Sequence, residues 1–138
     1  ADLAKAARWI EPIGEAVADQ LKSWDLQSNQ INLVGHSLGA YVSFEIAKNL
    51  GGVNGLVALD PAITTTGAYS ISSVNFSDYS KESVGLWTSF LGSYATSSTA
   101  TPYINKLNAN LETLPWYKQD NPKDRHTAAV TEYARMFE

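Results

Sequence analysis

The chain contains no cysteine, which excludes a disulfide framework, a thiol nucleophile and sulfur-ligated zinc. It has two histidines, His36 and His126, too few for a multi-histidine metal site. No apolar run approaches the roughly 20 residues that span a bilayer, and no basic-then-apolar leader follows Ala1. The net charge of −4 argues against a nucleic-acid partner, which requires a basic surface.

The composition that remains is that of a folded domain. Hydrophobic residues make up 44% of the 138 positions and aromatic residues 11%, which excludes a disordered chain. A chain of this length can bury a substantial core. We therefore expect residues 1–138 to form one domain.

The first two thirds of the sequence alternate between helical and strand patterns. Apolar residues recur every three or four positions from Leu3 to Trp24, which predicts an amphipathic helix with a kink or restart at Pro12. The next segments predict a strand, a turn, a helix and a second strand, at 30–34, 35–39, 40–50 and 53–59. Such a βαβ unit implies an α/β fold with a mostly parallel sheet and flanking helices.

The remainder is harder to interpret. Residues 61–101 are rich in Ser and Thr but too apolar for a linker. We expect strands near 73–77, 84–90 and 103–107, with a helix at 81–91 as the alternative to the second. A polar loop over 108–125 precedes a final helix that begins after His126. Its expected buried face consists of Val130, Tyr133, Ala134 and Phe137.

The segment Gly35-His36-Ser37-Leu38-Gly39 has the pattern G-x-S-x-G between a predicted strand and a predicted helix. This is the context of a nucleophile elbow, in which a sharp turn exposes the serine hydroxyl. We expect side chains at positions 35 and 39 to collide with neighbouring elements, which would explain both glycines. The backbone N–H of Leu38, at the start of the helix, is the expected oxyanion donor. The alternative is a glycine-rich turn that binds nothing or binds phosphate.

A serine nucleophile needs a histidine base and an acid that orients it. His36 adjoins the serine and points sideways from the turn, so we interpret it as structural. His126 is then the base by elimination. The acid is expected after the serine and before the histidine. Asp60 meets this condition at the carboxyl end of a predicted strand, and we favour it over Asp78. Two further acids compete for the role, Asp120 and Asp124.

At this point the sequence resembles a known family. Gly35-His36-Ser37-Leu38-Gly39-Ala40, followed 23 residues after the serine by Leu59-Asp60-Pro61-Ala62, is similar to the GHSLGA and LDPA motifs of the pancreatic-lipase-type α/β-hydrolases. The resemblance covers residues 1–62 and implies that Asp60 is the triad acid. The Ser/Thr-rich part more loosely resembles lipase domains of large secreted bacterial proteins. This second likeness favours secretion, although the compartment stays open.

The sequence also departs from that family. Family members carry a histidine-glycine oxyanion loop and several strands ahead of the helix with which this chain starts. We therefore expect a partial fold, completed by an N-terminal segment or a second chain.

The resulting hypothesis is a serine hydrolase that cleaves carboxylic esters, most naturally lipid esters, through Ser37, Asp60 and His126 and an acyl-enzyme. It needs no metal or organic cofactor. Two alternatives stay open: a catalytically silent or binding piece of a larger hydrolase, and a thioesterase or acyltransferase. Candidate residues for an acyl pocket or lid are Trp87, Phe90, Leu91, Tyr94, Trp116 and Tyr117.

Overall fold

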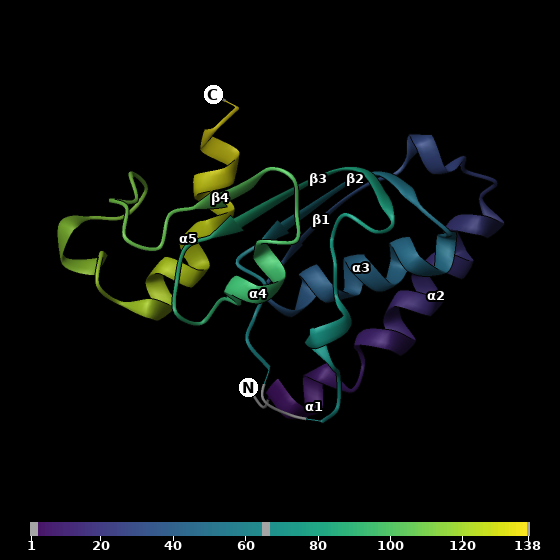
Figure 1. The fold of residues 1–138 in the computed structure, drawn as a ribbon, viewed down its shortest axis with the longest axis horizontal. Helices are drawn as coiled ribbons and strands as arrows, with labels where there is room; N and C mark the ends of the chain where they lie inside the picture. The colour runs from purple at the N-terminus through teal and green to yellow at the C-terminus, as the bar shows by residue number, and fades with distance from the viewer. Residues whose placement is uncertain (1–2, 65–66, 138) are drawn as a thin grey trace.

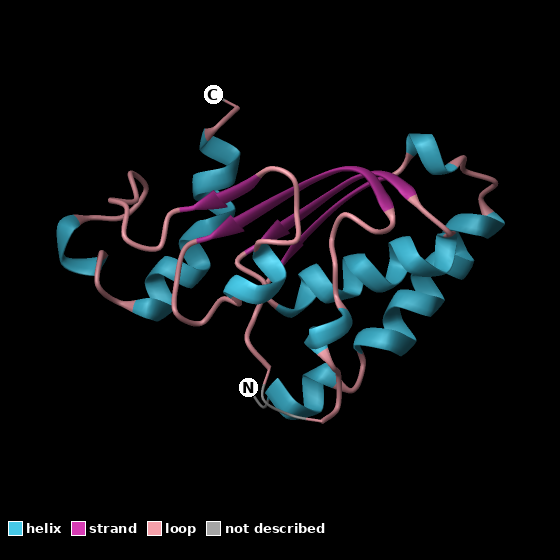
Figure 2. Cartoon of the chain, in the orientation of Figure 1, coloured by secondary structure: helices cyan, strands magenta, loops and turns pink. Residues whose placement is uncertain are grey.

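The computed structural model describes residues 3–64 and 67–137, and the side chains of Leu3 and Ala4 lie outside that description. Its centre is a four-stranded sheet, in which neighbouring strands are parallel and follow the order of the chain. The strands are β1 (Asn32–His36), β2 (Val53–Leu59), β3 (Ser80–Trp87) and β4 (Tyr103–Asn105). Helices flank this sheet (Figures 1 and 2). The expected α/β class with a parallel sheet is thus confirmed.

Five α-helices and three short 3₁₀ helices connect or flank the strands in the described part of the chain. The α-helices are α1 (Leu3–Ala7), α2 (Ile10–Ser23), α3 (Leu38–Leu50), α4 (Tyr94–Ser97) and α5 (Pro122–Arg135). The 3₁₀ helices are η1 (Ser28–Gln30), η2 (Ile71–Ser73) and η3 (Trp116–Lys118). Helix α3 is the crossover between β1 and β2, so the predicted βαβ unit is present.

Strand β2 is largely apolar, as expected for a strand with both faces covered. Leu56 and Ala58 belong to the larger core cluster, which includes residues of α2 and α3. The alternate residues Val57 and Leu59 lie in a second cluster with Ala129 of α5. Because side chains alternate along the strand, one face of β2 packs in the cluster of α2 and α3 and the other face packs against α5.

The first helical segment breaks at residues 8–9, ahead of the expected position at Pro12. Helix α2 begins at Ile10, which places Pro12 in its first turn, where a proline needs no intrahelical N–H partner. Its buried positions are Ile10, Gly14 and Ala18. Ile13 is 44% exposed, so the expected apolar face is rotated. The reason is close packing on α3, since a Cβ atom on Gly14 would overlap the Glu45 side chain.

The Ser/Thr-rich segment is the least accurately predicted part. The predicted strand at 73–77 is wrong, because η2 covers residues 71–73 and Val74 and Phe76 are buried in a non-strand segment. The predicted strand at 84–90 is present as β3 but begins and ends earlier, and the alternative helix is excluded. The strand predicted over 103–107 is present as the shorter β4.

The last helix begins four residues before His126 rather than after it. The Asn121 side chain caps it by accepting hydrogen bonds from the N–H groups of Lys123 and Asp124, and Pro122 occupies the first turn. The predicted apolar face is confirmed only at Tyr133, which packs against the cluster of Leu59, Leu86 and Ala129. Val130 is 44% exposed and Phe137 is 71% exposed. The buried positions are instead Arg125, Ala128, Ala129 and Glu132.

Strand β1 lies at one edge of the sheet, next to β2 alone. Val34 points to the same face as Val57 but is 60% exposed. A hollow of about 290 Å³ lies on this face, bordered by Val34, Val57, Val84 and Tyr133. Strand β1 is therefore covered on one face and largely open on the other.

In the described part of the chain, no helix is both long enough and apolar enough to cross a membrane.

Candidate active site

The turn between β1 and α3 holds Ser37 in a backbone conformation that is rare for a residue with a side chain. Its φ is 59° and its ψ is −126°. Strain of this kind costs roughly 1–3 kcal/mol and persists when the surroundings impose it. The Ser37 N–H donates to the Leu59 carbonyl at 3.1 Å, and a Cβ atom on Gly35 would overlap the Gly39 carbonyl. The expected collision at Gly39 is wrong, since nothing lies within 4 Å of a Cβ atom there.

His126 stands between Ser37 and Asp60. Its Nε2 lies 2.9 Å from Ser37 Oγ, and its Nδ1 lies 2.6 Å from Asp60 Oδ2. An ionised carboxylate only accepts hydrogen bonds, so the proton of a neutral imidazole resides on Nδ1. Nε2 is then free to accept the hydroxyl proton of Ser37. The three residues expected to act together are thus in hydrogen-bond contact, although they come from three separate segments.

Asp60 is fully buried, and a set of donors surrounds its carboxylate. The backbone N–H groups of Thr88 and Ser89 donate to Oδ1 at 2.7 and 3.2 Å. The Ser89 hydroxyl donates to Oδ2, the oxygen that also accepts from His126. These bonds compensate for burying a charge, which is costly without partners. Asp60 itself has a positive φ of 43° and is held by its N–H bond to the Leu86 carbonyl.

The competing acids lie elsewhere. Asp78 is exposed in the turn before β3, where its N–H donates to the Asn75 carbonyl. Asp124 lies in the first turn of α5, where its backbone N–H donates to the capping side chain of Asn121. Asp120 is exposed and borders a surface cavity. His126 contacts Asp60 and not these three in the hydrogen bonds of the described residues.

Gly92 leaves room for the Asp60 carboxylate. A Cβ atom at this position would overlap Asp60 Oδ1 and crowd the whole carboxyl group. The segment is anchored by a bridge between Ala62 and Gly92 and by the Ile63 N–H bond to the Leu91 carbonyl. The segment after β2 and the segment after β3 therefore cover Asp60 together.

His36 contacts His126 rather than Ser37. Its Nε2–H donates to the His126 backbone carbonyl at 2.7 Å, and the two ring centroids are 4.7 Å apart. Burial lowers the pKa of His36 below its ordinary value, an effect that the hydrogen bond to the carbonyl opposes. The lowered pKa favours the neutral form of the His36 ring.

Ser37 and His126 are both partly exposed, whereas the acid is buried. The His126 side chain is 16% exposed, and Asp60 is inaccessible. Leu38 is the first residue of α3, so its N–H has no acceptor within the helix. This N–H, beside Ser37, is available to an oxygen that develops negative charge.

The six aromatic and aliphatic candidates for a pocket or lid do not form one group. Trp87 donates its indole N–H to the Gly92 carbonyl and packs against Tyr94. Phe90 and Leu91 follow Ser89 and are 69% and 42% exposed. Trp116 and Tyr117 pack on each other on η3 and are largely exposed. Of the six, Phe90 and Leu91 directly follow the residues that hold Asp60.

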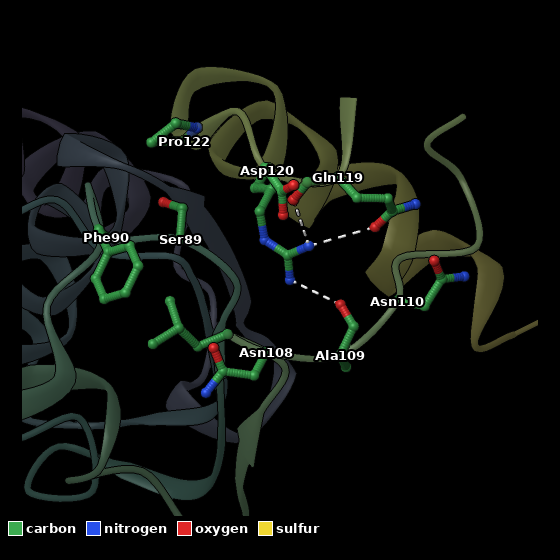
Figure 3. Close-up of a pocket in the computed structure, with 10 residues that line it drawn as sticks. Ser89, Phe90, Asn108, Ala109, Asn110, Gln119, Asp120 and Pro122 are labelled. Atoms are coloured by element: carbon green, nitrogen blue, oxygen red, sulfur yellow. Dashed lines mark hydrogen bonds between the residues drawn. The ribbon is translucent and has the colours of Figure 1, made fainter. Parts of the chain in front are cut away.

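A cavity of about 330 Å³ lies beyond Ser89 and Phe90 (Figure 3). It is bordered by polar groups of the loops around Asn108 and Asp120 and by Arg125 of α5. Among the described residues, no group of three or more histidine, aspartate or glutamate side chains could hold a metal ion.

No family model matches the chain, and neither the curated proteins nor the solved structures contain a significant match.

Thr88, Ser89 and Gly92 were not identified from the sequence, although they contact the Asp60 carboxylate or leave room for it. The sequence did contain a signal that could have identified Thr88. Thr88 is the first residue after β3, just as Ser37 and Asp60 are the first residues after β1 and β2. The carboxyl ends of parallel strands meet at one edge, so the residues after the third strand were candidates too.

Proposed function

We propose that this chain is a serine hydrolase of the α/β-hydrolase type that cleaves carboxylic esters. The observation that carries the proposal is the continuous hydrogen-bonded series from Ser37 Oγ through His126 to Asp60. The strained serine between a strand and a helix supports it as well. The same three residue types in the same relation perform acyl transfer on unrelated folds, and roles follow from this geometry.

In the proposed reaction, Ser37 Oγ attacks the carbonyl carbon of the ester while His126 Nε2 takes the hydroxyl proton. The Leu38 N–H stabilises the negative oxygen of the tetrahedral intermediate. Collapse of the intermediate breaks the bond to the alcohol, which leaves with the proton returned by His126. Water then attacks the acyl-enzyme with His126 again as base, releasing the acid and restoring Ser37. Asp60 remains ionised throughout and holds the imidazolium.

The surroundings of the site favour an apolar acyl group. Phe90, Leu91 and Ile63 are exposed by 42–69% on the two segments that close over Asp60. Exposed apolar side chains gathered beside a reactive group are typical of a surface that binds apolar ligands. We therefore propose lipid esters as the substrate class.

We further propose that an additional strand, from an N-terminal segment or a second chain, completes the sheet beside β1. The open edge and the 60% exposure of Val34 support this part of the proposal. Such a segment would also be the natural source of a second oxyanion donor.

The test is covalent labelling with a fluorophosphonate probe, followed by peptide mass spectrometry. We expect the label on Ser37 and its loss in Ser37→Ala. Ser28→Ala is the matched control, because Ser28 is an exposed serine on η1. Labelling that persists in Ser37→Ala, or that is absent from the unmodified chain at high probe concentration, would contradict the proposal. Turnover of oxygen esters and thioesters of equal acyl length then identifies the preferred substrate class.

A further inference from the structure

Arg125 is a buried cation whose partners are neutral oxygens. It is 7% exposed and lies one residue before His126 on α5. Its Nε donates to the Thr88 carbonyl at 2.8 Å. Its Nη1 donates to the backbone and side-chain oxygens of Gln119 at 3.0 and 3.3 Å. Its Nη2 donates to the carbonyls of Lys106 and Ala109 at 2.6 and 2.9 Å.

These hydrogen bonds use every donor of the Arg125 side chain. A guanidinium group has five N–H donors, and the five bonds account for all of them. Arg125 also borders the cavity of about 330 Å³, and Figure 3 shows the bonds to Ala109 and Gln119 at its wall. Because no donor is left over, the cavity is not an anion site built on this arginine. The guanidinium instead joins three segments of backbone.

The bond to Thr88 is reciprocated. The Thr88 hydroxyl donates to the Arg125 carbonyl at 2.9 Å, so two hydrogen bonds in opposite directions tie α5 to the end of β3. The Thr88 N–H in turn donates to Asp60 Oδ1 at 2.7 Å. One short path therefore connects the residue before His126 with the acid that His126 contacts. Both side chains of the pair are buried.

We propose that Arg125, together with Thr88, is a positioning device that sets the distance between His126 and Asp60. The inference rests on the proposed hydrolase function. In the hydrogen bonds of the described residues, the Arg125 side chain does not contact Ser37, Asp60 or His126, and it acts by fixing the first turn of α5 against the loop that holds Asp60. Arginine suits this task because its planar fork fixes several acceptors at once, whereas a lysine ammonium on a flexible stem does not.

The test compares three variants of the protein with the unmodified chain. Arg125→Lys keeps the charge and loses the fork. Thr88→Val removes the hydroxyl bond to the Arg125 carbonyl but keeps the N–H that Asp60 accepts. Arg135→Lys is the matched control, because Arg135 lies on the same helix but makes an exposed ion pair with Glu112. Three quantities are measured: kcat and KM on a soluble short-chain ester, the downfield proton resonance of the His126 Nδ1–H, and the unfolding temperature.

For both Arg125→Lys and Thr88→Val we expect a shifted or broadened Nδ1–H resonance and a lower kcat, with KM within about twofold. A displacement of about 1 Å at a reacting group costs on the order of 10²-fold, so we expect a loss of about 10- to 100-fold in kcat for Arg125→Lys. Arg135→Lys should change kcat by less than about twofold. A merely structural role would lower the unfolding temperature and leave the resonance and kcat of the folded protein unchanged.

Two results would overturn the inference. The first is an unchanged resonance and kcat in the folded variants. The second is an equal loss in Arg135→Lys. Should Arg125→Lys not fold, Thr88→Val decides alone, since it changes a single hydroxyl. Failure of the proposed function is distinguishable, because it shows as absent probe labelling in the unmodified protein, whereas the resonance reports the contact between His126 and Asp60 without any turnover.

Discussion

Replacing Asp60 by asparagine is the most informative single change, because the structure determines how an amide must orient there. Two of the donors around the carboxylate are the backbone N–H groups of Thr88 and Ser89, and both reach Oδ1. Neither N–H can become an acceptor. The oxygen of the new amide must therefore face them, and its NH₂ group must take the position of Oδ2.

That orientation reverses the hydrogen bond to the imidazole. The Ser89 hydroxyl can rotate and accept from the new NH₂ group, but His126 Nδ1 can accept only by giving up its proton. The proton then resides on Nε2, which can no longer take the hydroxyl proton of Ser37. A wrong tautomer with intact geometry costs about 10⁴-fold in kcat, equivalent to about 5.4 kcal/mol of transition-state stabilisation.

The assay is kcat on a soluble short-chain ester, with circular dichroism and the unfolding temperature as checks of the fold. Asp78→Asn is the matched control, since Asp78 is an exposed aspartate in a turn away from His126. We expect the control to retain full activity. Full activity in Asp60→Asn together with a large loss in Asp78→Asn would refute the reasoning and assign the acid to the other aspartate.

Three further predictions follow from the same site and sheet. Gly92→Ala should lower kcat by about 10²-fold, because the added Cβ overlaps the Asp60 carboxylate; Gly67→Ala, with open space around it, should not. Since burial lowers the pKa of His36, the unfolded chain binds more protons near and below pH 6.5. The free energy of unfolding should therefore fall as the pH drops through this range, and less steeply in His36→Gln, as measured by urea titration. We expect the chain to self-associate through the open edge of β1 and Val34→Lys to reduce this association in sedimentation experiments; unchanged association would place the contact elsewhere.

The sequence was sufficient where local patterns and backbone sterics act together. Strand β2 matches its predicted bounds because an apolar run is confined between Gly52 and Pro61. The proximity of Ser37 and Asp60 follows from the rule that parallel strands end at one edge. His126 was reached only by elimination between two histidines. Even so, His126 lies in a helix rather than on the expected loop, because Asn121 ahead of Pro122 caps the helix before that residue.

The rest depends on tertiary contacts that no local pattern encodes. Arg125 is buried because four backbone carbonyls and one amide oxygen converge on it from three segments. An arginine in a polar sequence is expected at the surface. The buried face of α5 consists largely of alanines and of polar side chains with hydrogen-bond partners. The hydrophobic pattern of the sequence therefore predicted the wrong face of this helix. Val74 and Phe76 are buried without belonging to a strand, which alternating hydrophobicity cannot distinguish from one.

The spacing of the three site residues along the chain has a consequence for biosynthesis. The contact between Asp60 and His126 spans 66 positions, and that between Ser37 and His126 spans 89. A ribosome therefore releases the proposed nucleophile and acid, on adjacent strands, long before it releases the proposed base on α5. The nascent polypeptide lacks the proposed base until α5 docks, so the proposed ester cleavage cannot begin before that step. Proteolytic removal of α5 would take away the proposed base and would also uncover Leu59 and Leu86, which pack with Ala129 of that helix.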